Sequence, residues 1–346
     1  MPVRLSALSH ISAIVDDAAA AGRLLSDVFD APLLQRASSS SQQESATQIV
    51  HAGLGDVRLQ FIQPGTVDGG LHRQLREHGP QVHSLAFFVE DLASAVTELA
   101  HEGIAILERS DIVLQAATGP VEAPVCVFAT MERLGFNIEL IEGTSGSSKV
   151  AGDDEPPGDA LFGNLSPLLH VELAVDDLHD PCALLQQLFG SGKVESSFAQ
   201  FLSSLGSLDI VHVNLGNVVL QYCRPKTEDS PWAQLLARRG RAIHNITWLV
   251  RDMPATVAAL ARQDVQDLRS FSLDFGKLVG HENLPEHLAP QRIVDLMPRL
   301  GFHMELTEAF ASNIDDFIFN PFGNWKARPQ CPCWRPSNGD SFKFYR

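Results

Sequence analysis

The chain has 346 residues, of which 45% are hydrophobic and 20% are charged, a composition that fits roughly two globular domains. Its formal charge of -16 argues against nucleic acid or an anionic membrane surface as a partner, because both attract clustered Lys and Arg. The sequence shows no apolar run of membrane-spanning length and no signal or transit segment, so we expect a cytoplasmic protein that binds a small molecule.

Four short apolar strands each begin at or near a histidine and are followed by an aspartate that suits the N-cap of a helix. The expected strands cover residues 10–16, 83–89, 170–175 and 244–250, and the N-cap residues are Asp17, Asp91, Asp177 and Asp252. Further short segments of β-type composition follow each helix. The sequence therefore predicts four modules, each made of a strand, a helix and two or three more strands.

The two halves of the chain align with each other. IVHAGLGDVRLQFIQP, which starts at Ile49, matches IVHVNLGNVVLQYCRP, which starts at Ile210, without a gap, and LGFNIELIE from Leu134 matches LGFHMELTE from Leu300. An internal duplication explains this match. We expect an N-terminal domain at 1–145, a Gly, Ser and Pro-rich linker at 146–165, a C-terminal domain at 166–310, and an aromatic, Pro-rich arm at 311–346.

Four metal-ligand residue types recur in the same order in both halves. The sets are His10, Gln60, His83 and Glu139, and then His170, Gln221, His244 and Glu305. The separations are 50, 23 and 56 residues in the first set and 51, 23 and 61 in the second. Two imidazoles, an amide oxygen and a carboxylate suit a divalent Zn, Mn, Fe, Co or Ni ion and leave room for two substrate oxygens.

Strand alternation predicts which other side chains share the face of the ligands. The residues expected there are Ser12, Arg58, Phe87 and Asn137 in the first half, and Glu172, Val219, Trp248 and His303 in the second. His51 and His212 occupy equivalent strand positions, where each is either a core residue or a hydrogen-bonding neighbour of a ligand. The five cysteines are mostly within apolar runs, which is typical of buried reduced thiols.

These paired modules and ligand sets resemble the vicinal oxygen chelate superfamily, in particular its glyoxalase I and methylmalonyl-CoA epimerase branch, over about residues 5–310. The resemblance implies an α+β fold with four βαβββ modules paired into two glyoxalase-like domains. The tandem arrangement is similar to that of the 2-epi-5-epi-valiolone epimerases of aminocyclitol biosynthesis. It implies a divalent-metal-dependent epimerase that inverts a carbon beside a carbonyl through an enediolate, with a cyclitol ketone as substrate.

Three other functions remain open. An acyl-CoA epimerase of the methylmalonyl-CoA type uses the same ligand set. An Fe(II) extradiol-type dioxygenase would use His170, His244 and Glu305, although Gln221 would then fill a position that oxygen needs. A non-catalytic binding protein of the bleomycin-resistance kind is the third, and the retained ligands argue against it.

Four carboxylates are candidates for the acid/base group. Glu44 lies 16 residues before Gln60, close to the acid/base position of the resembling epimerases, and Leu205 replaces it in the second half. The ligands Glu139 and Glu305 are the alternatives, together with Glu172. Because Glu44 and Arg58 both belong to the first half, we expect the N-terminal domain to be the catalytic one. A homodimer that uses the C-terminal arm is a further expectation.

Overall fold

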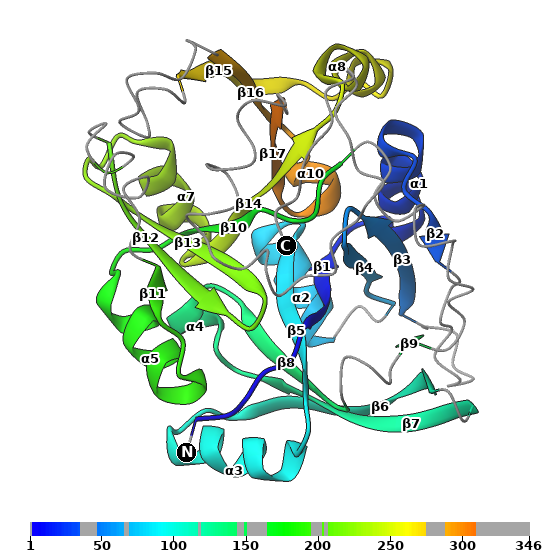
Figure 1. Ribbon diagram of the computed structural model, residues 1–346, viewed down its shortest axis with the longest axis vertical. Helices are drawn as coiled ribbons and strands as arrows, with labels where there is room; N and C mark the ends of the chain where they lie inside the picture. Colours follow the sequence, from blue (N-terminus) through cyan, green and yellow to red (C-terminus); the bar gives the residue numbers. More distant parts are fainter. Residues whose placement is uncertain are drawn as a thin grey trace, which may run out of the picture.

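The computed structural model describes residues 2–34, 47–65, 69–116, 119–143, 149–150, 165–194, 203, 207–274 and 288–308. Within them the chain forms two mixed β-sheets, each with helices packed on it (Figure 1). Each sheet combines two βαβββ modules, which confirms the predicted α+β class and the four modules. Glu44 and the predicted arm at 311–346 lie outside the described residues.

The first sheet has the strand order β2-β3-β4-β1-β5-β8-β7-β6-β9. Its central strands β1 and β5 are antiparallel, and each pairs in parallel with the last strand of its own module, β4 or β8. Lys149–Val150, within the stretch expected to be linker, forms the edge strand β9. The elements are β1 (Leu8–Ile14), α1 (Ala18–Phe29), β2 (Leu33–Leu34), β3 (Gln48–Leu54), β4 (Val57–Gln63), α2 (Gly70–His78), β5 (Gln81–Val89), α3 (Leu92–His101), β6 (Ile106–Ala116), β7 (Gly119–Phe128), α4 (Met131–Leu134), β8 (Asn137–Glu142) and β9.

The second sheet repeats this order as β11-β12-β13-β10-β14-β17-β16-β15. The elements are β10 (His170–Ala174), α5 (His179–Phe189), β11 (Lys193–Val194), β12 (Leu208–Leu215), β13 (Val218–Pro225), α7 (Pro231–Arg239), β14 (Ala242–Val250), α8 (Met253–Arg262), β15 (Asp267–Asp274), β16 (Leu288–Val294), α10 (Met297–Leu300) and β17 (His303–Glu308).

The helices begin where the aspartates predict. Asp17, Asp91 and Asp252 are N-cap residues, and each side chain accepts a hydrogen bond from the backbone N–H three residues later. Asp177 differs slightly, because helix α5 begins one residue later, after Leu178. Its carboxylate still accepts from the N–H groups of His179 and Asp180, so it stabilises the same helix end.

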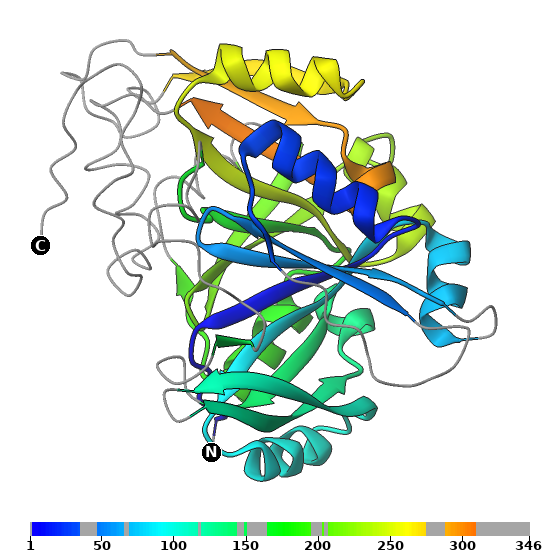
Figure 2. The same ribbon diagram turned by 90° about the vertical axis from the view of Figure 1, so that its right-hand side faces the viewer.

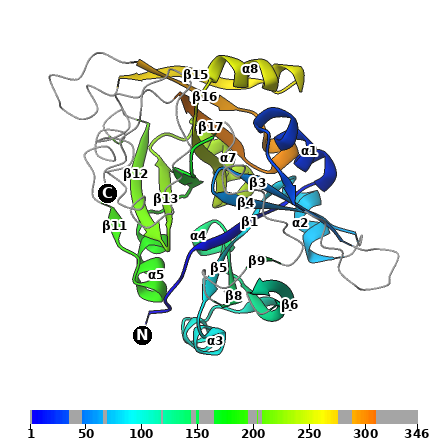
Figure 3. The ribbon, with the colours of Figure 1, turned by 45° about the vertical axis from the view of Figure 1, so that its right-hand side comes forward.

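One continuous hydrophobic core joins the two sheets through the faces that carry Phe87 and Trp248. The backbone N–H of Val3 donates to Leu188 O, so the N-terminal segment runs along α5 of the other domain (Figure 3). On the opposite side, α1 of the first domain lies beside α8 and α10 of the second (Figure 2). The two domains are therefore packed into a single body.

Among the described residues, no helix combines the length and the apolar character that a membrane crossing requires. Cys126, Cys182 and Cys223 are free and buried, as predicted.

Candidate metal sites

The four candidate ligands of the N-terminal domain lie on neighbouring strands β1, β4, β5 and β8. The register pairs Ser12 with Gln60 and with Ser84, and Ala86 with Glu139, so these residues lie across one face of the sheet. His83 is the extra residue of a β-bulge, since Ser12 pairs with Ser84 whereas Ala13 pairs with Val82. Adjacent residues of a bulge can point to the same side of a sheet, which brings His83 to the face of the other ligands.

Glu139 lies at the centre of this N-terminal cluster. Its Oε1 is 3.3 Å from His10 Nε2, and its Oε2 accepts a hydrogen bond of 2.9 Å from Ser84 Oγ. Burial opposes ionisation of Glu139, but His10, Ser84 and His83 outweigh it and hold its pKa below the usual range. Asn137 Nδ2 lies 3.5 Å from His83 Nδ1, so this predicted neighbour does contact a ligand.

His51 and Arg58 lie near the same cluster. His51 pairs with Gln60 across strands β3 and β4. Its pKa is lowered to about 3, mainly by burial and also by the nearby His10 and Arg58. The imidazole is therefore neutral at physiological pH, which is the form that accepts or donates a hydrogen bond without adding charge. Arg58 precedes Gln60 by two residues on β4 and shares its face.

The C-terminal domain repeats this arrangement. The register joins His212, Gln221, Glu172, Asn245 and His303 in one row across the sheet. A second row joins His170, Thr247 and Glu305, and His244 is again the extra residue of a bulge.

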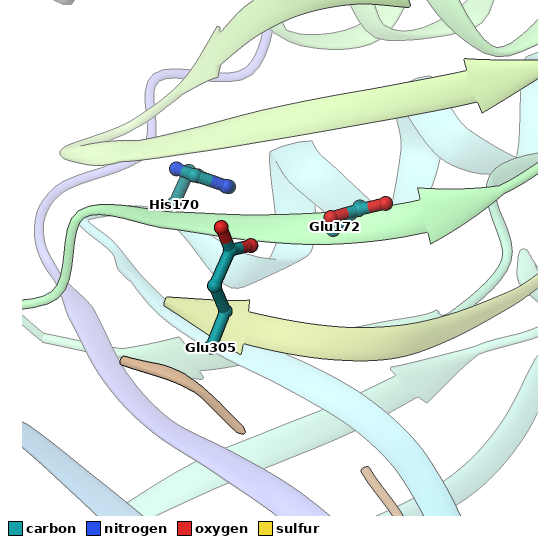
Figure 4. Close-up of side chains that lie close together, drawn as sticks. All are labelled: His170, Glu172 and Glu305. Carbon is teal, nitrogen blue, oxygen red and sulfur yellow. The ribbon is translucent and has the colours of Figure 1, made fainter. Parts of the chain in front are cut away.

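Three donor atoms of this domain, one each from His170, Glu172 and Glu305, lie within 4.8 Å of one another. His170 and Glu172 come from the same strand, and the side chain of Glu305 extends toward them (Figure 4). Glu172 Oε1 is 3.1 Å from His244 Nε2. The predicted acid/base candidate Glu172 is thus in contact with the predicted ligand His244, and His170 and Glu305 lie close to it.

The two carboxylates of this cluster differ in charge state. Burial, reinforced by Glu172, raises the pKa of Glu305 to about 8, so without a cation Glu305 is protonated at neutral pH. Burial also opposes ionisation of Glu172, but His244 outweighs it and lowers its pKa to about 2. Asn245 Nδ2 donates to both, at 3.3 Å to Glu172 Oε2 and 3.1 Å to Glu305 Oε2.

The remaining contacts orient the ligands. His212 Nε2 is 2.8 Å from Gln221 Oε1, and Thr247 Oγ1 is 3.0 Å from His170 Nε2. Burial lowers the pKa of His170 to about 3 and that of His212 to about 4, so both imidazoles are neutral at physiological pH. The neutral form is the one that His170 needs to bind a metal. His303 lies at the edge of the cluster, 3.3 Å from Asp295, on the same row as Asn245.

Two residues expected on the ligand face of the sheets lie on the opposite face. Phe87 and Trp248 belong to the hydrophobic core, because the bulges at His83 and His244 shift the alternation of β5 and β14 by one residue. Trp248 therefore does not line the site, and the expectation for it and for Phe87 is wrong. Val219 keeps the face of Gln221 and is buried.

Sequence reasoning missed three kinds of site residue. Ser84, Asn245 and Thr247 bind the glutamates. They stand one or three residues after the strand histidine, and their polarity at these positions signals the shifted alternation. Trp232 Nε1 donates to Glu172 Oε1 at 3.0 Å from α7, a contact across 60 residues that no local pattern shows. Glu108 is exposed but lies on the row of Glu139, and partial desolvation together with Glu139 raises its pKa.

Among the described residues, His170, Glu172 and Glu305 are the only three His, Cys or carboxylate donors that lie within 4.8 Å of one another, whereas the N-terminal set brings together one pair, His10 and Glu139. Two donors that bind one ion at about 2.1 Å lie at most about 4.2 Å apart, and the His10–Glu139 separation of 3.3 Å is within that limit. The 4.8 Å spread in the C-terminal cluster needs only a small closure. In each domain the donors are two imidazoles, an amide and at least one carboxylate on rigid strands, a set that suits transition metals.

The family model of the Glyoxalase/Bleomycin resistance protein/Dioxygenase superfamily matches residues 9–121 and again 169–270. Mitochondrial methylmalonyl-CoA epimerase from Homo sapiens is 32% identical over 106 residues, which are 30% of this chain and 58% of that protein. The chain thus spans little more than half the length of this relative.

Two solved structures share the fold. A variant of 4-hydroxymandelate synthase from Streptomyces coelicolor superposes with a TM-score of 0.61 at 17% identity, covering 90% of this chain and 96% of that one. The Mn(II)-bound glyoxalase from Novosphingobium aromaticivorans gives 0.51 at 11% identity, covering 88% and 83%. With a family model that matches both of its halves, the chain belongs to the Glyoxalase/Bleomycin resistance protein/Dioxygenase superfamily.

Proposed function

We propose that the protein is a divalent-metal-dependent epimerase that inverts a carbon beside a carbonyl, and that the N-terminal domain carries the reaction. The observation that carries this proposal is the fourth donor, Gln60, on the ligand face beside His10, His83 and Glu139. A dioxygenase site of two histidines and one carboxylate keeps an open position for oxygen, whereas an amide donor occupies it. The identity with a methylmalonyl-CoA epimerase supports the same reaction class.

His10, Gln60, His83 and Glu139 would hold a divalent ion, which would polarise a substrate carbonyl and make the α proton easier to remove. Glu139 is the group on this face that takes or returns that proton. Ser84 holds one of its oxygens at 2.9 Å, which fixes the direction of the other. Inversion needs delivery from the opposite side, for which Glu44 is the predicted partner.

Arg58 distinguishes the N-terminal site from the C-terminal one, where Val219 takes its place. A guanidinium on the ligand face binds hydroxyl or anionic oxygens of a substrate. We therefore propose a polyhydroxylated cyclic ketone, such as 2-epi-5-epi-valiolone, as the substrate. An acyl-CoA thioester is the second candidate, and the methylmalonyl-CoA epimerase relative supports it.

Solvent exchange tests the reaction class. In deuterated water under strict anaerobiosis, the metal-loaded protein should invert the substrate and incorporate deuterium at the inverted carbon. It should do so with Mn²⁺ or redox-inert Zn²⁺. Dependence on oxygen, or inversion without deuterium, would contradict proton transfer and favour an oxidative reaction.

Metal content tests the ligand assignment separately. His10→Ala with His83→Ala should empty the N-terminal site, and the same changes at His170 and His244 the C-terminal site. A quadruple variant that kept the wild-type metal content would show that these residues are not the ligands.

A further inference from the structure

The C-terminal site contains a buried carboxylate that the N-terminal site lacks. Glu172 occupies the position that Ser12 has in β1, two residues after the first histidine ligand. It is 5% exposed, and its Oε1 is 3.1 Å from His244 Nε2. Ser12 is also buried, but its hydroxyl makes no hydrogen bond among the described residues. The C-terminal site thus presents five donors where the N-terminal site presents four.

The position of Glu172 is fixed from both sides. Trp232 Nε1 donates to its Oε1 at 3.0 Å, and Asn245 Nδ2 donates to its Oε2 at 3.3 Å. The ring of Trp232 also packs edge-on against His244, with centroids 6.5 Å apart. In the gapless alignment Leu71 takes the place of Trp232, and its side chain has no donor. The extra carboxylate and the residue that orients it therefore occur together in one domain.

Two carboxylates this close can both be ionised only when a cation lies between them. Glu172 and Glu305 share the amide of Asn245, and a donor atom of His170 lies within 4.8 Å of each. Placing two buried like charges side by side is unfavourable unless an opposite charge lies between them. A divalent ion at this point would be held by both carboxylates and by His170.

We propose that Glu172 is a metal ligand, and that it makes the C-terminal site a structural metal site with too few open positions for the substrate, while the N-terminal site stays open for catalysis. The inference rests on the proposed function, in which each domain binds a divalent ion. His170, Gln221, His244 and Glu305 would supply four donors to a six-coordinate ion, and Glu172 would supply a fifth. One position remains, too few for a substrate that binds through two oxygens. Closed coordination is typical of structural sites, and open coordination of catalytic ones.

Binding of Co²⁺ to each domain in turn tests this. The His10→Ala, His83→Ala protein isolates the C-terminal site, and the His170→Ala, His244→Ala protein isolates the N-terminal one. The dissociation constant is measured by competition with a chromophoric chelator. We expect the C-terminal site to bind Co²⁺ ~10- to 100-fold more tightly than the N-terminal site, or more. Residues that only hydrogen-bond to metal ligands already change metal affinity by this factor, and Glu172 is proposed to be a ligand itself. Co²⁺ should also raise the melting temperature more through this site.

Glu172→Ser in the first background should weaken Co²⁺ binding to about the level of the N-terminal site, change the visible spectrum of bound Co²⁺ and remove the extra thermal stabilisation. The reciprocal Ser12→Glu in the second background should strengthen binding. Glu172→Gln keeps the shape of the side chain, and circular dichroism of the metal-free proteins verifies the fold.

If Co²⁺ affinity and the visible spectrum are unchanged in both Glu172→Ser and Glu172→Gln, Glu172 is not a ligand and the inference is wrong. The proposed function would not be affected, because the protein would still bind metal. Absence of Co²⁺ binding in both double-alanine backgrounds would overturn the metal dependence of the proposed function, and the inference with it.

Discussion

In the metal-free protein, Glu305→Gln should increase stability, and the increase should grow with pH. Burial and the neighbouring Glu172 raise the pKa of Glu305 from 4.5 to about 8. The unfolded chain loses this proton near pH 4.5, whereas the folded chain keeps it until about pH 8. Between these values the unfolded state binds fewer protons, so the free energy of unfolding falls as pH rises.

The size of this destabilisation follows from the same pKa shift of Glu305. At about 1.4 kcal/mol per pH unit, the cost is small near pH 5, about 3 kcal/mol at pH 7 and about 5 kcal/mol above pH 8. Glutamine has nearly the same shape and no proton to lose, so the variant lacks this cost. Urea unfolding of both proteins in a chelator at pH 5, 6, 7 and 8 gives the difference directly.

Glu139→Gln in the other domain is the matched control with the opposite sign. The pKa of Glu139 is lowered, so its ionised form stabilises the folded state above the unfolded pKa, and this stability is lost as pH falls. Its replacement should therefore destabilise the protein at pH 7. A Glu305→Gln difference that is independent of pH, or that is negative at pH 7, would refute the reasoning.

Three shorter predictions concern turnover, acid and the domain interface. With the metal bound, Glu139→Gln should lower turnover by ~10² to 10⁴ and by more than Glu305→Gln does; the reverse ranking would move the reaction to the C-terminal domain. Burial lowers the pKa of His212 to about 4, so the free energy of unfolding should decrease by up to about 3 kcal/mol as pH falls below 6.5. Urea titrations of His212→Asn should show a smaller decrease over the same pH range. Gly301→Ala should lower the free energy of unfolding by at least ~2 kcal/mol more than Gly103→Ala does. Both glycines have positive φ, but a Cβ would meet backbone only at Gly301, where it would lie 2.5 Å from Gln81 N. Equal melting temperatures of the two variants would contradict this.

Much of the fold was predictable because the duplication supplies two copies of each signal. The four histidine strands and the aspartates after them correspond to β1, β5, β10 and β14 and to the starts of their helices. A strand that begins at a histidine is ambiguous in one copy. The same strand in a second copy, at nearly the same distance from an equivalent glutamine, is a much stronger indication.

The site was less predictable because alternation fails at a bulge. In β14 the polar residues after His244 are Asn245 and Thr247, and the apolar ones are Ile246 and Trp248. Counting in twos from His244 selects Trp248, whereas the structure places Asn245 and Thr247 beside Glu305. The polarity pattern was visible in the sequence, but it gives the correct face only when one residue is allowed for the bulge.

The residues that the bulges move out of the sites, Phe87 and Trp248, also lie where the two domains pack against each other. A Cβ on Gly55, in the β3–β4 turn, would lie 2.3 Å from Ser166 O and 3.1 Å from Trp248 Nε1. At the equivalent turn, a Cβ on Gly216 would lie 2.8 Å from Ser6 O and 3.2 Å from the Phe87 ring. Each domain thus places a glycine turn against an aromatic residue of the other, with positive φ at both turns. Because these close contacts restrict the interior face of both sheets, substitution there costs stability in both domains at once. On the ligand faces, by contrast, the equivalent residues Ser12 and Glu172 differ, although each pairs with the glutamine of its own domain, Gln60 or Gln221.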